Sequence, residues 1–380
     1  MANDALGLAK LAKNDEFYTQ FDDIEQEVNA YLDYDANVFR GKSVLLPCDD
    51  PEWSNFTKFF AENFTRLGLA KLVSTSFAPE AKRQKYGLAL PKQAELFERE
   101  SLLYDEKKTN TKGKIFVLDA TNAGGVSDWD SMRHAWRYLG GTGDFASDEV
   151  CALRDEADFV ITNPPFSLFR EFVSWIRAAP THKRFLIIGN MNAITYKEIF
   201  PLIKENQLWL GATGFVTDMV FGVPEGAVVK EADRAKAAKL GYVGNYTRLG
   251  NSCWFTNMEH GRRHEVMQLD TMQANIRHNK KIHGAYPHYD NYDAIEVAST
   301  DAIPRDYDGV MGVPISFLDR YCPEQFEIVG CTANGLVDEA QKLPWHKPHN
   351  NPFINGEAKY QRILIRHRKG SGAGEGGGDK

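Results

Sequence analysis

The feature that most constrains this chain is an apolar run that ends in two consecutive prolines. The apolar or β-branched residues 159–162 are followed directly by Asn163-Pro164-Pro165-Phe166. Proline has no amide N–H and a fixed φ, so it terminates a buried strand. Residues 167–178 then place large apolar side chains three and four positions apart, as on one face of a helix. The sequence therefore predicts a buried strand, a rigid turn and an amphipathic helix.

The predicted turn carries polar groups that suit a particular kind of ligand. In open α/β sheets, ligands bind at the carboxyl ends of the strands. The Asn163 amide and the Pro164 carbonyl supply two acceptors, Pro165 keeps the turn rigid, and Phe166 supplies an aromatic face. Such a set suits a planar ring with an exocyclic amine, such as adenine. The simpler alternative is that the prolines only end a strand, but the flanking strand and helix favour a binding site.

Strands and helices alternate over the first half of the chain. Strands are expected at 43–47, 71–77, 115–118, 159–162, 184–189 and 208–212, and helices at 53–67, 93–103, 129–139 and 167–178. Repeated strand–helix units predict an α/β fold with a doubly wound, parallel, Rossmann-like sheet over about residues 40–213.

The pattern changes after residue 213 to segments rich in Gly, Pro, Asn, Tyr and charged residues. We therefore expect a catalytic domain in residues 1–213 and an irregular α+β domain in residues 214–369. Residues 370–380 are mostly glycine and are predicted to be a disordered tail.

The charge distribution leaves room for a nucleic-acid partner. The net charge of −7 argues against a generally basic surface, but local clusters are what matter. Basic runs occur at 262–264, 277–281 and 359–369, with tyrosines between them. Each run alone fits a solvated surface, whereas the three together predict a face that contacts phosphates.

Other classes of protein are disfavoured. No stretch reaches the roughly 18–20 apolar residues of a membrane span, and residues 1–13 lack a signal-peptide core. The five cysteines form no CxxC pair, which fits reduced thiols in a cytoplasmic protein. No metal is expected, because His346 and His349, with Cys331 upstream, have no fourth ligand at metal-binding spacing.

Several strings in this sequence resemble a known family. Asn163-Pro164-Pro165-Phe166 is similar to the [DNS]-P-P-[YFW] signature of amino-group methyltransferases that use S-adenosylmethionine. Over most of its length the chain resembles the EcoRI-type adenine-specific DNA methyltransferases. The matching segments are residues 15–20, 48–51, 161–171, 194–198, 307–314, 323–327 and 362–365. Residues 230–246, 330–351 and the tail show no such resemblance.

The resemblance implies a cofactor site for S-adenosylmethionine. The residues implied to form it are Phe17, Tyr18 and Thr19, then Cys48, Asp49 and Asp50, then Asp144 and Phe145, together with Asn163. At Asp49 and Asp50 the wider superfamily has glycines, so capping of the following helix is an alternative role for these two residues. Asp144 resembles the residue that binds the cofactor's adenine amine, and Phe145 the residue that covers its ring.

The resemblance also implies the reaction. The protein would transfer a methyl group from S-adenosylmethionine to N6 of an adenine flipped out of double-stranded DNA, as a restriction–modification or orphan enzyme. Its catalytic residues would be Asn163, Pro164, Pro165 and Phe166. It would act as a monomer with no obligate protein partner. Methylation of adenine N6 in RNA, or of a protein glutamine, is the alternative.

Overall fold

The computed structural model describes residues 18–81, 99, 101–122, 129–214, 219–223, 229–282, 284–344 and 350–368. By their contacts, the residues form two compact units. The first contains residues 1–190 and 216–258, and the second contains residues 191–215 and 259–380. This division differs from the predicted boundary at residue 213. The predicted tail, and most of the helix expected at 93–103, lie outside the described residues.

The first unit holds the larger sheet and most of the longer helices. Its strands are β1 (Tyr18–Thr19), β2 (Ser43–Leu46), β3 (Lys71–Thr75), β4 (Lys114–Asp119), β5 (Arg137–Tyr138), β6 (Phe159–Thr162), β7 (Arg184–Asn190), β9 (Val220–Gly222), β10 (Tyr246–Arg248) and β11 (Ser252–Thr256). Its helices are α2 (Phe21–Tyr34), α3 (Asn55–Glu62), α4 (Phe64–Leu67), α7 (Glu106–Thr109), α8 (Trp129–Met132), α9 (Asp148–Glu156), the 3-10 turn η2 (Phe166–Leu168) and α10 (Phe169–Arg177). Helix α12 (Glu231–Lys239) precedes β10.

The main sheet of this unit is mixed. Its strands follow the order β5-β4-β3-β2-β6-β7-β11. The strands β3, β2, β6 and β7 are parallel, as predicted. By contrast, β4 runs antiparallel to β3, β5 to β4, and β11 to β7. The prediction of a wholly parallel sheet was therefore wrong for these outer strands.

Helices cover both faces of the main sheet. Trp254 and Phe255 are neighbours in β11, so their side chains point to opposite faces. The Trp254 ring packs against Phe56 of α3, and the Phe255 ring packs against Phe169 of α10. Helices α3 and α10 thus lie on opposite faces. This burial explains why the central strands β2 and β6 are almost continuously apolar.

Chain order within the parallel strands places a switch point between β2 and β6. From β2 the chain passes through α3 to its neighbour β3, and from β6 it passes through α10 to its neighbour β7 on the other side. Connections that leave two adjacent strands in opposite directions diverge at the carboxyl ends of those strands. Ligands of open α/β sheets bind at such a crevice.

The helix expected at 129–139 was a wrong prediction. Helix α8 ends at Met132, and residues 137–138 form the edge strand β5 against β4. The buried Trp136 accounts for the change, because Lys114 Nζ lies 4.9 Å from the centre of its ring. Packing against a buried lysine on the neighbouring strand outweighs local helix propensity here.

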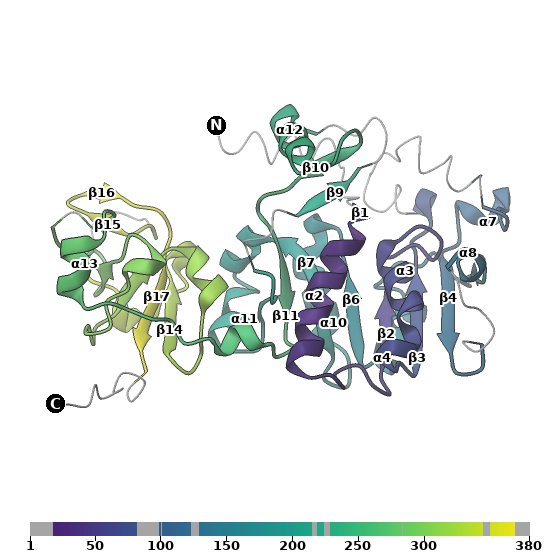
Figure 1. The fold of residues 1–380 in the computed structure, drawn as a ribbon, viewed down its shortest axis with the longest axis horizontal. Coiled ribbons are helices and arrows are strands. Elements are labelled where there is room, and N and C mark those ends of the chain that lie inside the picture. The colour runs from purple at the N-terminus through teal and green to yellow at the C-terminus, as the bar shows by residue number, and fades with distance from the viewer. Residues whose placement is uncertain are drawn as a thin grey trace, which may run out of the picture. The chain divides into compact units, whose positions relative to one another are not determined.

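A small second sheet covers the edge of the main sheet where the parallel strands have their carboxyl ends (Figure 1). In this sheet β9 pairs antiparallel with both β1 and β10. Residues 219–223 and 246–248, which were predicted to belong to the second domain, are therefore part of the first unit. Of these, β9 pairs directly with β1, the strand that contains Thr19, and β10 pairs with the other edge of β9.

The second unit is built around a four-stranded sheet. Its strands are β12 (Ile295–Glu296), β13 (Met311–Val313), β14 (Phe326–Cys331) and β17 (Ile363–His367), in the order β12-β13-β17-β14, with β8 (Trp209–Leu210) and the pair β15 (Phe353–Ile354) and β16 (Glu357–Ala358) elsewhere in the unit. Its helices are α11 (Phe200–Lys204) and α13 (Met272–His278), with 3-10 turns η3 (Met191–Thr195), η4 (Gly261–His264), η5 (Thr300–Ala302), η6 (Ile315–Arg320), η7 (Ala333–Gly335) and η8 (Glu339–Gln341). None of the described helices in either unit combines the length and apolar character that crossing a bilayer requires.

Candidate active site at the carboxyl edge of the main sheet

The Asn-Pro-Pro-Phe turn lies where the sequence predicts it. Strand β6 is fully buried and ends at Thr162, and Asn163 begins the turn. Leu168 N donates to Pro165 O at 2.9 Å, which closes the turn into η2. Pro164 is buried, whereas Asn163 and Phe166 are half-buried. The two side chains with predicted roles thus reach the surface of the crevice from a rigid support.

The small β1-β9-β10 sheet contacts both of these side chains. Asn163 Nδ2 donates to Thr19 Oγ1 at 3.2 Å. The ring centre of Phe166 lies 6.5 Å from that of the buried Phe221 in β9, in an edge-on arrangement. Asn55 Nδ2 donates to the Thr19 carbonyl at 2.8 Å, which ties β1 to the start of α3. The small sheet therefore forms one wall of the candidate site.

Asp49 lies just beyond β2 and is buried, with 5% of its surface exposed. Ser54 Oγ donates to Asp49 Oδ1 at 2.7 Å, and Thr162 Oγ1 donates to Oδ2 at 2.5 Å. Burial raises the pKa of the Asp49 carboxyl from its ordinary 3.8 to about 7, against the lowering effect of these hydrogen bonds. Because the pKa is raised in the folded state, the contribution of Asp49 to stability falls as the pH rises from about 4 to about 7.

Asp50 belongs to a buried group of charges. Lys114 Nζ lies 3.1 Å from Asp50 Oδ2 and 3.4 Å from Glu52 Oε2, and the Lys114 and Glu52 side chains are 3% and 0% exposed. His134 Nδ1 lies 3.2 Å from Glu52 Oε1, and Ser101 Oγ donates to the same oxygen at 2.9 Å. Two carboxylates thus share one ammonium group at the end of β2.

The segment that contains Gly143 runs alongside the carboxyl end of β3. Ala78 N donates to Thr142 O at 2.7 Å. Gly143 has a φ of +78°, and a Cβ at this position would lie 2.1 Å from the Ser76 carbonyl oxygen. Both the positive φ and the close backbone approach require glycine here.

Asp144 and Phe145 follow this glycine, and both are buried. Asp144 Oδ1 accepts a hydrogen bond from Ala146 N at 3.0 Å. The Phe145 ring packs edge-on against Phe172 and Trp175, with ring centres 5.2 and 5.6 Å away. The segment places a carboxyl group and an aromatic ring beside the end of β3, next to β2 in the sheet.

The predicted site residues therefore gather along one edge of the main sheet, at the ends of three adjacent strands. They are Asp144 and Phe145 beside β3, Cys48, Asp49 and Asp50 after β2, Asn163 to Phe166 after β6, and Tyr18 and Thr19 in the wall above them. Phe17 lies outside the described residues. Phe166 and Cys48 are half-buried, and Tyr18 is 38% exposed.

Comparisons with known proteins show which family this chain belongs to. The family model described as adenine-specific methyltransferase EcoRI matches residues 5–368. The chain belongs to this family. It is 38% identical to the type II methyltransferase M.EcoRI of Escherichia coli in an alignment 377 residues long that covers 97% of each chain. It is 33% identical to M.MpnI of Mycoplasma pneumoniae over 366 residues, 95% of this chain and 97% of that protein. No solved structure gives a significant match.

Family membership identifies the protein as an adenine-specific type II DNA methyltransferase, the class found in restriction–modification systems. The resemblance read from the sequence is thereby confirmed. The family also implies a methyl donor and a DNA partner. Among the described residues, no group of three or more His, Cys, Asp and Glu side chains is arranged to hold a metal ion. His346 and His349 lie outside the described residues.

Several buried polar residues of the candidate site were not predicted from the sequence. Lys114 and Glu52 are charged residues that read as solvent-facing in a sequence, yet both are buried. Thr162 reads as an ordinary β-branched strand residue, but its hydroxyl bonds to Asp49. The available signal was the pair Thr162-Asn163, which sets a hydroxyl directly before the predicted catalytic amide.

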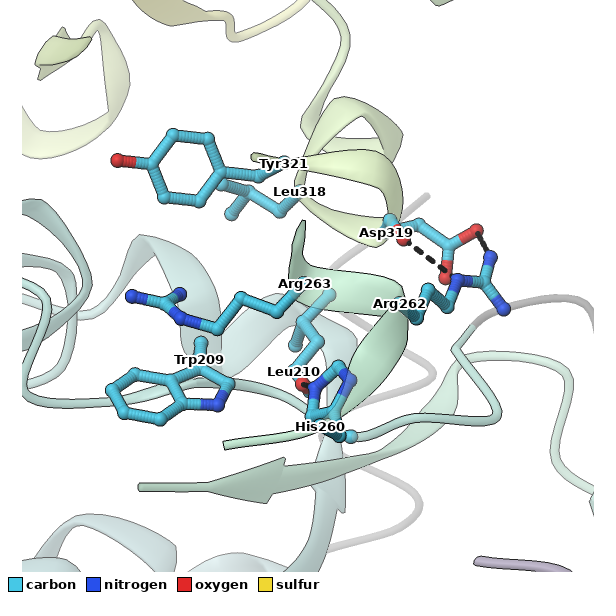
Figure 2. A pocket seen from close by; sticks show the side chains of 9 residues that line it. Trp209, Leu210, His260, Arg262, Arg263, Leu318, Asp319 and Tyr321 are labelled. Atoms are coloured by element: carbon cyan, nitrogen blue, oxygen red, sulfur yellow. Dashed lines mark hydrogen bonds and ion pairs between the residues drawn. The ribbon is translucent and has the colours of Figure 1, made fainter. Parts of the chain in front are cut away.

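In the second unit, Arg263 of the predicted basic run 262–264 is buried, and Arg262 and His264 are half-buried. The Arg263 guanidinium carbon lies 3.8 Å from the Trp209 ring centre, and Nη2 donates to Asn206 Oδ1 at 2.9 Å. Figure 2 shows this side chain lying between Trp209 and Tyr321 in a small pocket. Burial lowers the pKa of the neighbouring His260 to about 4, so its neutral imidazole hydrogen-bonds to a backbone carbonyl.

Several basic side chains predicted to contact phosphates are paired with acids instead. These ion pairs are Arg262–Asp319, Arg263–Glu259, His264–Glu324, Lys281–Asp301, Lys359–Glu357, Arg362–Glu296 and Arg366–Glu327. The tyrosines between the runs are also internal, because Tyr286, Tyr289 and Tyr292 are buried. The run 277–281 differs in part, since Arg277 and Lys280 are exposed at the end of α13, whereas the exposed Lys281 pairs with Asp301.

Proposed function

We propose that this methyltransferase transfers the methyl group of S-adenosylmethionine to N6 of an adenine flipped out of double-stranded DNA. The observation that carries the proposal is the position of Asn163-Pro164-Pro165-Phe166. This turn follows β6 at the crevice beside the end of β2, where an open α/β sheet binds its ligands. A base stacked inside a duplex cannot reach such a crevice, so the target must be extruded.

The residues along the edge fit S-adenosylmethionine by their chemistry. This cofactor supplies an electrophilic methyl group on a sulfonium. Asp50 shares Lys114 with Glu52, so the end of β2 carries an excess of carboxylate that suits the cofactor's ammonium and sulfonium charges. We assign Cys48, Asp50 and the wall residues Tyr18 and Thr19, with Phe17, to the methionine end; Asp49 lies beside them with both carboxylate oxygens bonded to Ser54 and Thr162.

The adenine end of the cofactor is assigned to Asp144 and Phe145. The Asp144 carboxylate accepts from the adenine amine while retaining its bond to Ala146 N, since each carboxylate oxygen has two lone pairs. The Phe145 ring, held by Phe172 and Trp175, bounds this end of the site. Asn163 closes the cofactor site on the side of the target base.

The catalytic turn acts on the target adenine by hydrogen bonding and position. The Asn163 amide oxygen and the Pro164 carbonyl accept the two N6 hydrogens and direct the nitrogen lone pair towards the methyl group. Phe166 stacks on the flipped ring, and Pro165 keeps the turn rigid. No covalent nucleophile is needed, because alignment of the two reactants supplies much of the rate.

Recognition of DNA is assigned to residues 214–369, with the enzyme acting as a monomer. Within this region, the exposed cations at the end of α13 are the described group best placed for phosphates, since most other predicted ones are ion-paired. Phe221 of β9 lies against Phe166 of the proposed catalytic turn instead, so residues 219–223 would contact the flipped base or its neighbours.

The test is to sequence adenine methylation in DNA from cells that express this chain. We expect N6-methyladenine at one recurring sequence and none in cells carrying the empty vector. Purified enzyme should transfer labelled methyl to duplex DNA and not to duplex or single-stranded RNA. Transfer to RNA in preference to DNA would contradict the proposed substrate.

Replacing the acid assigned to the cofactor adenine should weaken cofactor binding. We expect Asp144→Ala to raise the dissociation constant for S-adenosylmethionine about 10- to 100-fold, as for loss of a hydrogen bond with a charged partner. Calorimetric titration without DNA measures it. Asp148→Ala, which removes an exposed acid at the start of α9, is the matched control. Equal affinity in the two variants would remove Asp144 from the site.

Neutralising the exposed run after α13 should weaken binding to DNA of any sequence. For Arg277→Gln and Lys280→Gln together, we expect the slope of log affinity against log salt to flatten by about 0.9 for each phosphate that is no longer neutralised. Fluorescence anisotropy with a labelled duplex at several salt concentrations measures this slope. Arg366→Gln is the control, because this exposed arginine is already paired with Glu327. An unchanged slope in the double variant would exclude this surface.

A further inference from the structure

We propose that Asp49 is a positioning residue that acts through the Thr162 hydroxyl to hold Asn163 in its catalytic place. The inference rests on the proposed catalytic role of Asn163. It changes the role of Asp49 from a direct contact of the cofactor to a fixed support between the cofactor site and the catalytic turn.

The polar groups of Asp49 form hydrogen bonds with other residues of the protein. Its backbone N donates to Thr75 O at 3.1 Å, and its backbone O accepts from Ser74 Oγ at 2.6 Å. Its two carboxylate oxygens accept from Ser54 and Thr162. Each polar group of Asp49 therefore already has a protein partner, and the side chain is buried. Such a residue fits a structural support better than a ligand contact.

The bond to Thr162 spans the switch point between two diverging strands. The backbone register of β2 and β6 runs through Val44–Phe159 and Leu45–Val160. Thr162 lies two residues beyond that register, where its backbone remains aligned with Ile187 of β7. Its hydroxyl is thus a side-chain link from β6 back to the chain that leaves β2.

Thr162 is fully buried and directly precedes Asn163, so its position fixes where the Asn163 backbone leaves the sheet. On the other side, Thr19 accepts from the Asn163 amide. The catalytic amide is therefore held at its backbone by the Asp49–Thr162 bond and at its side chain by β1. Catalysis by alignment is sensitive to such support, since a displacement of about 1 Å can cost about 100-fold in rate.

The test compares Thr162→Val, which removes the hydroxyl at nearly constant volume, with Thr162→Ser, which keeps it. Thr75→Val is the matched control, because Thr75 is equally buried and its hydroxyl bonds at 3.3 Å to the backbone of Pro47, not to Asp49. The readouts are the single-turnover rate of methyl transfer to duplex DNA and the calorimetric affinity and stoichiometry for S-adenosylmethionine. The stoichiometry counts folded molecules, so each rate is expressed per competent enzyme.

For Thr162→Val we expect a single-turnover rate about 10- to 100-fold lower, with cofactor affinity within about threefold of the parent. Thr162→Ser should recover the rate to within about threefold, and Thr75→Val should not lower it by more than that. If the valine variant does not fold, Thr162→Ala removes the same hydroxyl without added bulk and is judged by the same readouts.

Three results would overturn the inference. One is an unchanged rate after loss of the hydroxyl, and another is a loss of cofactor affinity as large as the loss of rate. The third is failure of the serine variant to recover activity. Asn163→Ala separates this inference from the proposed function: an active Asn163→Ala enzyme refutes the proposed function. An inactive one, combined with a fully active Thr162→Val enzyme, refutes only the role of Asp49.

Discussion

Asn163→Ala should lower the single-turnover rate of adenine methylation by about 100- to 1,000-fold, the usual loss when a preorganised polar group is removed from a reacting centre. The variant should keep its fold, because Asn163 is half-buried and follows the last residue of β6. Its amide donates to Thr19, a bond that contributes about 1 kcal/mol. Rapid-quench measurement with labelled cofactor gives the rate, and calorimetry verifies cofactor binding.

Asn163→Asp provides the comparison that identifies the chemistry. Aspartate keeps an oxygen acceptor in the same place, so this variant should retain more activity than the alanine variant. Asparagine and aspartate both occur in the signature that this turn resembles. An alanine variant that stays within a few-fold of the parent would show that the Asn163 amide does not polarise the target amine.

The sequence predicted the place of the turn at residues 163–166 correctly because its signals are local. A continuous apolar strand, two prolines and a helical repeat each act within a few residues, and the structure has β6, the turn and α10 in that order. The helix expected at 129–139 failed for the opposite reason. Whether this segment forms a helix depends on the contact between Trp136 and Lys114 of β4. No periodicity within the segment predicts that contact.

The charged residues also depend on contacts with residues that are distant in the sequence, which local patterns do not predict. Arg262 and Arg263 read as a basic patch, yet Asp319 pairs with the first and Trp209 stacks on the second. Each of these partners lies more than fifty positions away in the sequence. A cluster of like charges in sequence therefore predicts a binding surface only where the fold brings no acid to it, as for Arg277 and Lys280, which remain exposed.

Lys114→Met should destabilise the first unit by about 3–5 kcal/mol, the usual effect of removing one partner from a buried group of charges. Methionine replaces the apolar stem of the lysine, so the loss reflects the charge. Without Lys114, the carboxylate of the fully buried Glu52 and that of Asp50, which is 22% exposed, would both lose their ammonium partner. The free energy of unfolding in urea, followed by tryptophan fluorescence, measures the change.

Lys71→Met is the matched control for this prediction. Lys71 begins β3 as Lys114 begins the adjacent strand β4, and it too forms an ion pair, with Glu156 at 3.1 Å. Its side chain and that of Glu156 are 36% and 66% exposed, so the loss should not exceed about 1 kcal/mol. The double variant Lys114→Met with Glu52→Gln should recover part of the stability, because fewer charges remain buried without a partner. Equal losses in the free energy of unfolding for the two lysine variants would mean that burial does not increase the contribution of Lys114 to stability.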